Sequence, residues 1–225
     1  MKYGQWCPVA KAAEVLAERW TLLVVRELVL GSTRYAQLQR GLGRISPGIL
    51  SARLKTLTDH GIVERVEGRG PHAEYRLTEA GRELTPIIEG IGVWGQRWAR
   101  SRMTADELDV EVLVLTVQRY FDVSSFPLDS GVVGLAFSDL HGEARRWWLK
   151  VDEHGVEICT KSPGPESVRL TSSLRTLSEI YRGDVPLLGA IDGGRVEVDG
   201  TPKVVRSVHR WLRLPALAGV RDARA

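Results

Sequence analysis

The fold of the N-terminal half is decided by ISPGILSARLKTLTDHGIVERV, residues 45–66. Ser46 can accept a hydrogen bond at a helix start. Pro47 suits the first helical position, because an N–H group there would have no acceptor within the helix and its absence costs nothing. At about 100° per residue, one side of the helix carries three leucines, Leu50, Leu54 and Leu57. The other side is small, polar and basic. The stretch therefore predicts a helix with one face in a core and the opposite face open to a ligand.

A hairpin is expected directly after this helix. Gly61 can end the helix in the left-handed conformation, residues 62–66 alternate as a strand, and residues 73–78 read as the returning strand. A helix followed by a hairpin with basic residues at its tip is typical of a winged helix-turn-helix. The pattern alone also fits any helix with a solvated face that precedes a hairpin.

A winged helix reads DNA by placing its second helix in the major groove, where small side chains allow close approach to base edges. The residues expected to contact DNA are Ser46, Pro47, Gly48, Ser51, Ala52, Lys55, Thr56, Arg69 and His72. Ser51 and Lys55 are the groove candidates, while Arg69 and His72 at the wing tip can reach phosphate or the minor groove. Arg53 flanks the core face, which favours a salt bridge or phosphate contact over base reading.

Length and composition fit a globular protein with two domains. The chain has 225 residues, of which 43% are hydrophobic and 26% charged, enough for two units of about 100 residues each. Residues 1–104 carry 16 Lys and Arg against 10 Asp and Glu, whereas residues 105–225 carry 15 against 18. A basic half joined to a mildly acidic half fits a nucleic-acid-binding domain linked to a second domain.

Several classes of protein are disfavoured by what the sequence lacks. No apolar run is long enough to span a bilayer and no signal peptide opens the chain, so we expect a cytoplasmic protein with no membrane partner. Two distant cysteines and five scattered histidines form no disulfide framework, metal site or catalytic arrangement, and no phosphate-binding loop is present. We therefore expect no enzymatic activity, no metal and no cofactor.

The helices around the hairpin complete the pattern. Helices are expected at residues 8–17, 20–28, 35–40 and 84–98, and the last carries an apolar stripe suited to a core or a partner helix, made of Ile87, Ile91, Trp94 and Trp98. The residues that carry a family resemblance are Cys7-Pro8-Val9, Arg19-Trp20-Thr21, Arg26-Glu27-Leu28, Gly31, Tyr35-Ala36-Gln37-Leu38, Ile45-Ser46-Pro47, Leu50, Arg53-Leu54, Leu57, Gly61-Ile62-Val63, Arg65, Tyr75-Arg76-Leu77-Thr78 and Gly81.

Over residues 6 to about 98 the chain closely resembles the HxlR-type winged-helix transcriptional regulators. The resemblance implies a homodimer that binds double-stranded DNA at a palindromic operator, with the first and last helices of the domain forming the dimer. Some members of that family use a cysteine at the position of Cys7 as an oxidant sensor, and a thiol at a helix N-terminus can have a lowered pKa. The alternative is that Cys7 is a small buried residue at the dimer contact.

The second half predicts an α+β domain. We expect domains at residues 1–104 and 105–225, the latter a mostly antiparallel sheet with helices on one face. Strands are expected at residues 132–137, 146–151, 156–160, 168–171 and 196–200, and helices at 107–120, 174–181 and 203–212.

The tail of this half, LRTLSEIYRG at residues 174–183 with GGRVEVDG at 193–200, resembles the end of sterol carrier protein type-2-like domains, and the strand at 147–151 also fits. Ser167 departs from that family, which often has an acidic residue there. The resemblance implies an α/β sandwich with a tunnel for a small apolar ligand. Candidate lining residues are Phe137, Trp147, Trp148, Leu149 and Leu177. Alternation allows only one of the two tryptophans to face the interior, where it can equally fill a core.

Two functions remain open at this point. The first is a DNA-binding transcriptional regulator, modulated by a small apolar ligand or through Cys7. The second is a lipid or small-molecule carrier whose winged helix mediates protein contacts.

Overall fold

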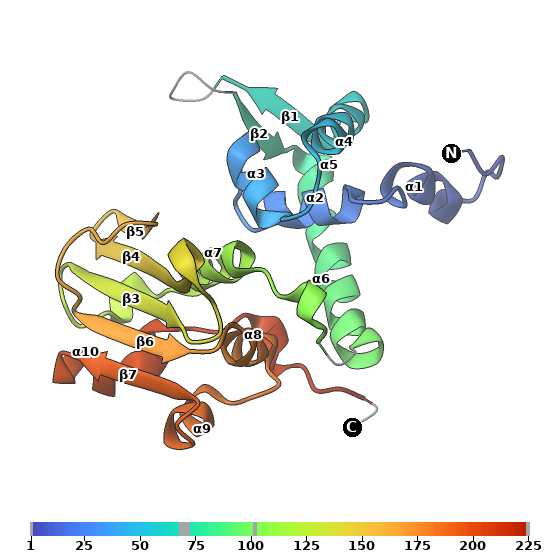
Figure 1. Ribbon diagram of the computed structural model, residues 1–225. Helices are drawn as coiled ribbons and strands as arrows, with labels where there is room; N and C mark the ends of the chain where they lie inside the picture. The colour runs from blue at the N-terminus through green and yellow to red at the C-terminus, as the bar shows by residue number, and fades with distance from the viewer. Residues whose placement is uncertain (1, 68–72, 101–102, 224–225) are drawn as a thin grey trace. The chain divides into compact units, whose positions relative to one another are not determined.

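The computed structural model of the chain describes residues 2–67, 73–100 and 103–223. Figure 1 shows the order of its elements, which fall into two compact units, Met1–Trp94 and Gly95–Ala225. The first unit contains α1 (Pro8–Leu16), α2 (Thr21–Val29), α3 (Tyr35–Gly41), α4 (Pro47–Asp59), β1 (Val63–Val66), β2 (Glu74–Leu77), α5 (Glu79–Arg82) and α6 (Thr85–Trp94). These elements make a winged helix-turn-helix fold, as the sequence predicted.

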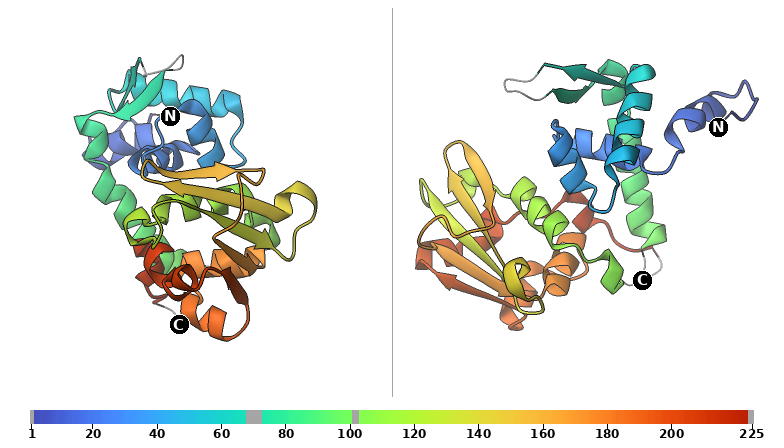
Figure 2. Two further views of the ribbon diagram at one scale, coloured as in Figure 1. Left: turned by 90° about the vertical axis from the view of Figure 1, so that its left-hand side faces the viewer. Right: turned by 45° about the horizontal axis from the view of Figure 1, so that its top comes forward.

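The core of the first unit lies under α4. It consists of Val24, Val25, Leu28, Leu38, Leu42, Ile45, Leu50, Leu54, Leu57 and Val63. Figures 1 and 2 show the β1–β2 hairpin beside α4, where β1 packs against the helix. The expected helices and both strands are present, and Gly61 has a φ of +66°, the left-handed conformation expected after the helix. The short α5 was not predicted.

The second unit is a mixed α/β structure. It contains η1 (Gly95–Ala99), η2 (Ala105–Glu107), α7 (Val110–Tyr120), η3 (Val123–Ser125), β3 (Gly131–Phe137), η4 (Gly142–Arg145), β4 (Arg146–Asp152), β5 (Gly155–Cys159), β6 (Val168–Ser172), α8 (Leu174–Arg182), α9 (Leu187–Asp192), β7 (Val196–Gly200), α10 (Pro202–Arg206), α11 (Val208–Trp211) and η5 (Ala216–Gly219). All five expected strands are present. The helix expected at 203–212 is instead two short helices that meet at Ser207, and α9 was not predicted.

The sheet of this unit is mainly antiparallel. Its strand order is β5-β4-β3-β6-β7, visible from top to bottom in Figure 1, and only the β3–β6 pair is parallel. One face of the sheet forms a core with α7, α8, α10 and α11, whose buried side chains include Val114, Leu177, Val204 and Trp211. Trp147 packs against this core, whereas Trp148 lies on the opposite, outer face of β4. The two tryptophans therefore separate as strand alternation requires.

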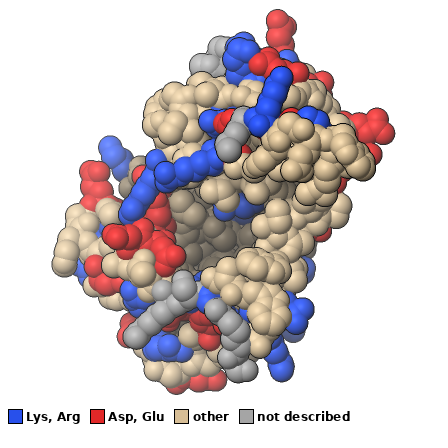
Figure 3. Space-filling model, turned by 90° about the vertical axis from the view of Figure 1, so that its right-hand side faces the viewer, with Lys and Arg blue, Asp and Glu red and all other residues tan. Residues whose placement is uncertain are grey.

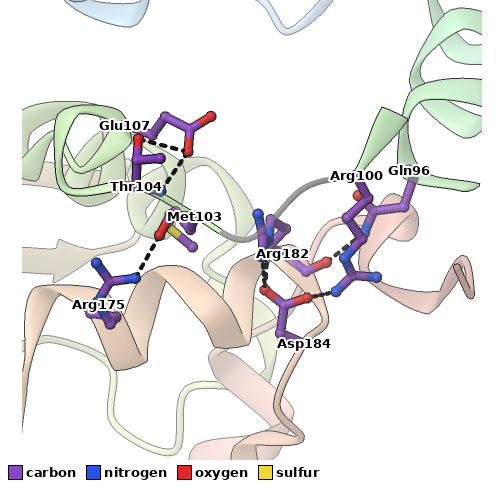
Figure 4. Close-up of polar contacts among 8 residues, drawn as sticks. All are labelled: Gln96, Arg100, Met103, Thr104, Glu107, Arg175, Arg182 and Asp184. Carbon is purple, nitrogen blue, oxygen red and sulfur yellow. Dashed lines mark hydrogen bonds and ion pairs between the residues drawn. The ribbon is translucent and has the colours of Figure 1, made fainter. Parts of the chain in front are cut away.

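The units divide ten residues before the boundary that the sequence suggested. The long helix expected at 84–98 is α-helical only to Trp94, and Gly95–Ala99 continues as a π-helical turn. Figure 4 shows why this turn belongs to the second unit: Gln96 Nε2 donates to the Arg182 carbonyl (2.5 Å), and Arg100 pairs with Asp184. The same Asp184 carboxylate accepts from Arg182 Nε at 2.5 Å. Backbone and ion-pair contacts thus fasten the turn to the end of α8.

The segment after the turn is fastened in the same way. Arg175 of α8 donates to the Met103 carbonyl at 2.8 Å, and Glu107 accepts from the backbone N–H of Thr104 at 2.7 Å (Figure 4). Hydrogen bonds from the N–H and hydroxyl of Thr104 hold the pKa of Glu107 below its ordinary value. Thr104 and Glu107 thus form a capping box on η2, while α7 begins at Val110, later than the helix expected from residue 107, with Asp109 as its cap. Among the described residues no helix has the length and apolar character to cross a membrane.

Candidate nucleic-acid interface

Local sequence signals fix the start and the orientation of α4. Ser46 Oγ accepts a hydrogen bond from the backbone N–H of Ile49 at 3.4 Å, and Pro47 occupies the first turn. The three leucines of the helix are at most 1% exposed, which anchors its inner face in the core. The opposite face is consequently directed away from the core.

The exposed face of α4 carries the predicted contact residues. Gly48, Ser51, Ala52 and Lys55 are exposed, and an alanine Cβ built at Gly48 would meet no atom within 4 Å. Thr56 is half-buried, and its hydroxyl donates to the Ala52 carbonyl at 3.0 Å. The small residues leave the helix backbone accessible to a large, flat ligand.

Lys55 is the cation at the centre of this face. Its side chain is 76% exposed, and its Nζ lies 2.6 Å from Asp59 Oδ2, one turn further along the helix. Exposed pairs at this spacing contribute only about 0.3–0.5 kcal/mol. A phosphate or base can therefore replace Asp59 at little cost.

Tyr35 of α3 contributes a contact that the sequence did not reveal. Its hydroxyl donates to the Pro47 carbonyl at 2.7 Å and lies 3.3 Å from Ser51 Oγ. The phenol thus joins α3 to the first turns of α4 and orients the hydroxyl of a groove candidate. The aromatic residue at the first position of α3 is the only sequence signal for this contact.

Arg53 is held in place by the protein itself. It pairs with Glu18, which lies between α1 and α2, and its side chain is 21% exposed. Of the two roles expected for this arginine, a salt bridge or a phosphate contact, the salt bridge is present.

A buried carboxylate supports the turn between α3 and α4. Glu27 is 1% exposed, and its Oε1 accepts from Arg26 Nη2 at 2.8 Å while its Oε2 accepts from Ser32 Oγ at 3.3 Å. Arg26 Nη2 also donates to the Gly41 carbonyl at 3.2 Å. The sequence analysis placed this arginine and glutamate only in the helix expected at residues 20–28 and did not predict their hydrogen bonds to each other, to Ser32 and to Gly41.

The base of the wing carries exposed charges of both signs, because Glu64 lies directly opposite Arg76 in the strand register. Arg65 and Arg76 are exposed, and Arg76 lies 2.8 Å from Glu74. Arg69 and His72, the two residues expected at the wing tip, lie outside the described residues.

An apolar stripe lies on α6 and continues into the π-helical turn. Ile87 and Ile91 are about half exposed, Trp94 is 61% exposed and Trp98 is 46% exposed. On the side drawn in Figure 3, broad areas of surface carry no charged residue. Large exposed apolar patches mark interaction surfaces more often than they mark free surface.

The remaining candidates lie as follows. Cys7 is a half-buried thiol at the N-cap of α1, and no group of three or more metal-ligating side chains occurs among the described residues. Burial raises the pKa of the other thiol, Cys159. Four of the five ligand candidates, Phe137, Trp147, Leu149 and Leu177, belong to the core between sheet and helices or pack against it. Trp148 does not, because it lies on the outer face.

Comparison with known proteins now identifies the first unit. The profile of the HxlR-like helix-turn-helix family matches residues 15–103. The uncharacterized HTH-type transcriptional regulator YvaP of Bacillus subtilis is 36% identical over 101 residues, which are 44% of this chain and 94% of YvaP. The chain belongs to the HxlR-like family.

Other relatives match the same HxlR-like region. The uncharacterized HTH-type transcriptional regulator Rv3095 of Mycobacterium tuberculosis is 44% identical over 92 residues, which are 40% of this chain and 58% of that protein. The crystal structure of PA1607 aligns with a TM-score of 0.42 at 37% identity, over 45% of this chain and 72% of that chain. The HxlR-like match ends at residue 103, before the sheet of the second unit begins.

Proposed function

We propose that this HxlR-like chain is a DNA-binding transcriptional regulator that reads a palindromic operator as a homodimer. The observation that carries the proposal is α4, a capped helix whose leucines are buried while its small, polar and basic face is exposed. The relatives' names as HTH-type transcriptional regulators agree with it. An enzymatic role has no support from the site.

The proposed contacts divide by chemistry. Ser51 and Lys55 read base edges, since a hydroxyl and an ammonium can donate to the acceptors that the major groove displays. The other α4 residues form the surface against the groove: Ser46, Pro47, Gly48, Ala52 and Thr56. Arg69 and His72 contact the backbone or the minor groove. Phosphate contacts position the domain and base contacts make it specific.

The proposed dimer uses α6. Its Ile87, Ile91 and Trp94, together with Trp98 in the turn that follows, are exposed in the single chain, and a second copy would remove them from water. In two-fold dimers of this kind the recognition helices meet half-sites about 34–36 Å apart. The palindrome follows from the symmetry.

We further propose that the second unit is a sterol carrier protein type-2-like module that binds a small apolar ligand between sheet and helices. One observation favours a bound ligand between the sheet and the helices: the Tyr181 hydroxyl is buried and has no hydrogen-bond partner among the described residues. Burial raises the pKa of this phenol, so it is neutral and able to donate. Native mass spectrometry of protein purified without denaturation should show a retained small molecule, and a bare mass would contradict the module.

The DNA proposal is tested by selecting bound fragments from a random pool and titrating salt. A palindromic consensus should emerge, with log affinity falling linearly in log salt as phosphate contacts require. Lys55→Ala and Ser51→Ala should weaken consensus binding by about 5–150-fold each, and Arg69→Ala should weaken binding to all sequences.

Lys203→Ala is the matched control, because Lys203 is an exposed lysine on α10 of the second unit. It removes the same charge outside the proposed interface and should leave the consensus affinity unchanged. A pool without enrichment would refute the regulator and favour a carrier whose winged helix binds protein. Peroxide treatment with and without Cys7→Ser tests oxidant control of DNA binding.

A further inference from the structure

The outer face of the second unit's sheet carries a row of side chains that no function proposed above uses. Strand register places Cys159, Trp148, Gly134, Arg169 and Asp199 side by side across all five strands. The row contains one large aromatic ring and one position without a side chain. The missing side chain opens space on an otherwise continuous sheet surface.

Glu166 fills part of that space. Its carboxylate lies directly over Gly134, where a Cβ would come within 2.7 Å of it. Trp148 Nε1 donates to Glu166 Oε1 at 2.8 Å, and Arg169 Nε donates to Glu166 Oε2 at 2.6 Å. Burial opposes ionisation, yet the hydrogen bonds from Arg169 and Trp148 hold the pKa of Glu166 below its ordinary value. The tryptophan ring is therefore oriented by a fixed anion.

A pocket with a volume of about 540 Å³ lies against this arrangement, which we call the outer-face pocket. Its lining comprises Arg146, Trp148, Glu166, Arg169 and Asp199, together with residues of the 162–165 segment and Gly200. The Ser162 hydroxyl donates to the Gly164 carbonyl at 2.9 Å, which holds that segment as a wall. The volume lies within the range of about 300–1,000 Å³ that small-molecule sites occupy.

The two arginines of the pocket differ in whether they already form an ion pair. Arg169 is occupied by Glu166 and lies opposite Asp199 in the strand register. Arg146 is exposed at the Trp148 end, and its guanidinium makes no hydrogen bond or close ion pair with the residues that the structure describes, although its charge helps to lower the pKa of Glu166. The pocket thus combines a preset indole plane with an unpaired guanidinium two residues away on the same face of β4.

We propose that the outer-face pocket binds a small aromatic carboxylate, with the ring against Trp148 and the carboxylate on Arg146. A guanidinium matches the geometry of a carboxylate with two parallel hydrogen bonds, and an indole face stacks on planar rings. Preorganisation by Glu166 lowers the ordering cost of binding. This site is separate from the proposed ligand region between sheet and helices, because it lies on the other face of the sheet.

The test uses the full chain labelled with ¹⁵N-tryptophan and 2-naphthoate as the probe. The chain has seven tryptophans, and the Trp148 indole resonance is assigned as the one missing from Trp148→Phe. Saturable binding should shift the Trp148 resonance and leave that of Trp147, on the core side, in place. The cationic analogue 2-naphthylmethylamine should bind at least about tenfold more weakly, since it lacks the charge-assisted hydrogen bonds.

Arg146→Gln should weaken 2-naphthoate binding by about tenfold or more, with the protein still folded because Arg146 is exposed. Lys150→Gln is the matched control, since Lys150 lies on the same face of β4, carries the same charge and does not line the pocket. If the two variants lost the same 2-naphthoate affinity, the effect would come from overall positive charge and not from a specific contact with Arg146, and the site would be overturned. Tighter binding of the amine, no saturable shift up to about 2 mM probe, or a shift confined to other tryptophans would each overturn it as well.

Discussion

Replacement of Gly41 by alanine should destabilise the first unit more than its single methyl group suggests. The new Cβ would lie 1.9 Å from Glu27 Oε2 and 2.5 Å from its Cδ, far inside contact distance. Glu27 is buried and held by Arg26 and Ser32, so its carboxylate cannot swing into water. Alanine must therefore break the contacts of the buried Glu27 carboxylate or push α3 away from α2.

The size of the effect follows from that geometry. Displacing the partner of the buried Glu27 carboxylate costs about 2–3 kcal/mol, less than for a fully buried ion pair because the Arg26 side chain is 40% exposed. A domain of this size has only about 5–15 kcal/mol of stability, and each kcal/mol shifts its melting temperature by about 4–8 °C. Gly41→Ala should thus lower the melting temperature of the first unit on the order of 10–20 °C.

Differential scanning calorimetry of the full chain measures this shift. Gly48→Ala is the matched control in the same unit, because its Cβ meets no atom and helix propensity favours alanine by up to about 1 kcal/mol. Adding Glu27→Ala to Gly41→Ala removes the clash, so the double variant should lose less than the sum of the single losses. A Gly41→Ala protein that melts within about 2 °C of the parent would refute the reasoning.

Three further outcomes are expected. Ser46→Ala should cost about 1 kcal/mol in urea unfolding because the α4 cap is lost, whereas Ser46→Asp retains it; equal losses would contradict the cap. Asp184→Asn should destabilise the second unit by about 1–3 kcal/mol, since Arg100 loses a mostly buried partner, and should speed hydrogen exchange at residues 95–100; unchanged exchange there would exclude the anchor. Because the pKa of Glu166 is lowered in the folded state, its contribution to stability is present above its unfolded pKa and is lost as the pH falls through its folded pKa. Glu166→Gln should therefore flatten the acid side of the stability profile, and an unaltered profile would argue against the shift.

The recognition helix could be predicted because its signals are local. Ser46 and Pro47 mark its start, Gly61 marks its end, and the leucine spacing gives its buried face, all within one short stretch. Tyr35 escaped prediction because the atoms that its hydroxyl meets lie 12 and 16 residues away. The contact of Arg26 with the Gly41 carbonyl, 15 residues away, escaped prediction for the same reason.

The end of α6 shows a different limit. Apolar periodicity continues through Trp98, so it predicted one helix, yet the backbone changes to a π-helical turn at Gly95. The contacts of Gln96 and Arg100 with the end of α8 account for the change, and nothing in the helical pattern encodes them. Alternation likewise required Trp147 and Trp148 to face opposite ways without telling which faced inward. Trp147 faces inward because the core side chains of β3 and α7 lie on its side of β4.

The paired tryptophans of β4 constrain how the gene can vary. Trp147 faces the core and Trp148 the outer-face pocket, so a one-residue insertion or deletion inside β4 would exchange the two environments along the rest of the strand. A two-residue change restores the phase. In a collection of variants that differ in the length of this strand, proteins changed by two residues should still fold, and proteins changed by one residue should not.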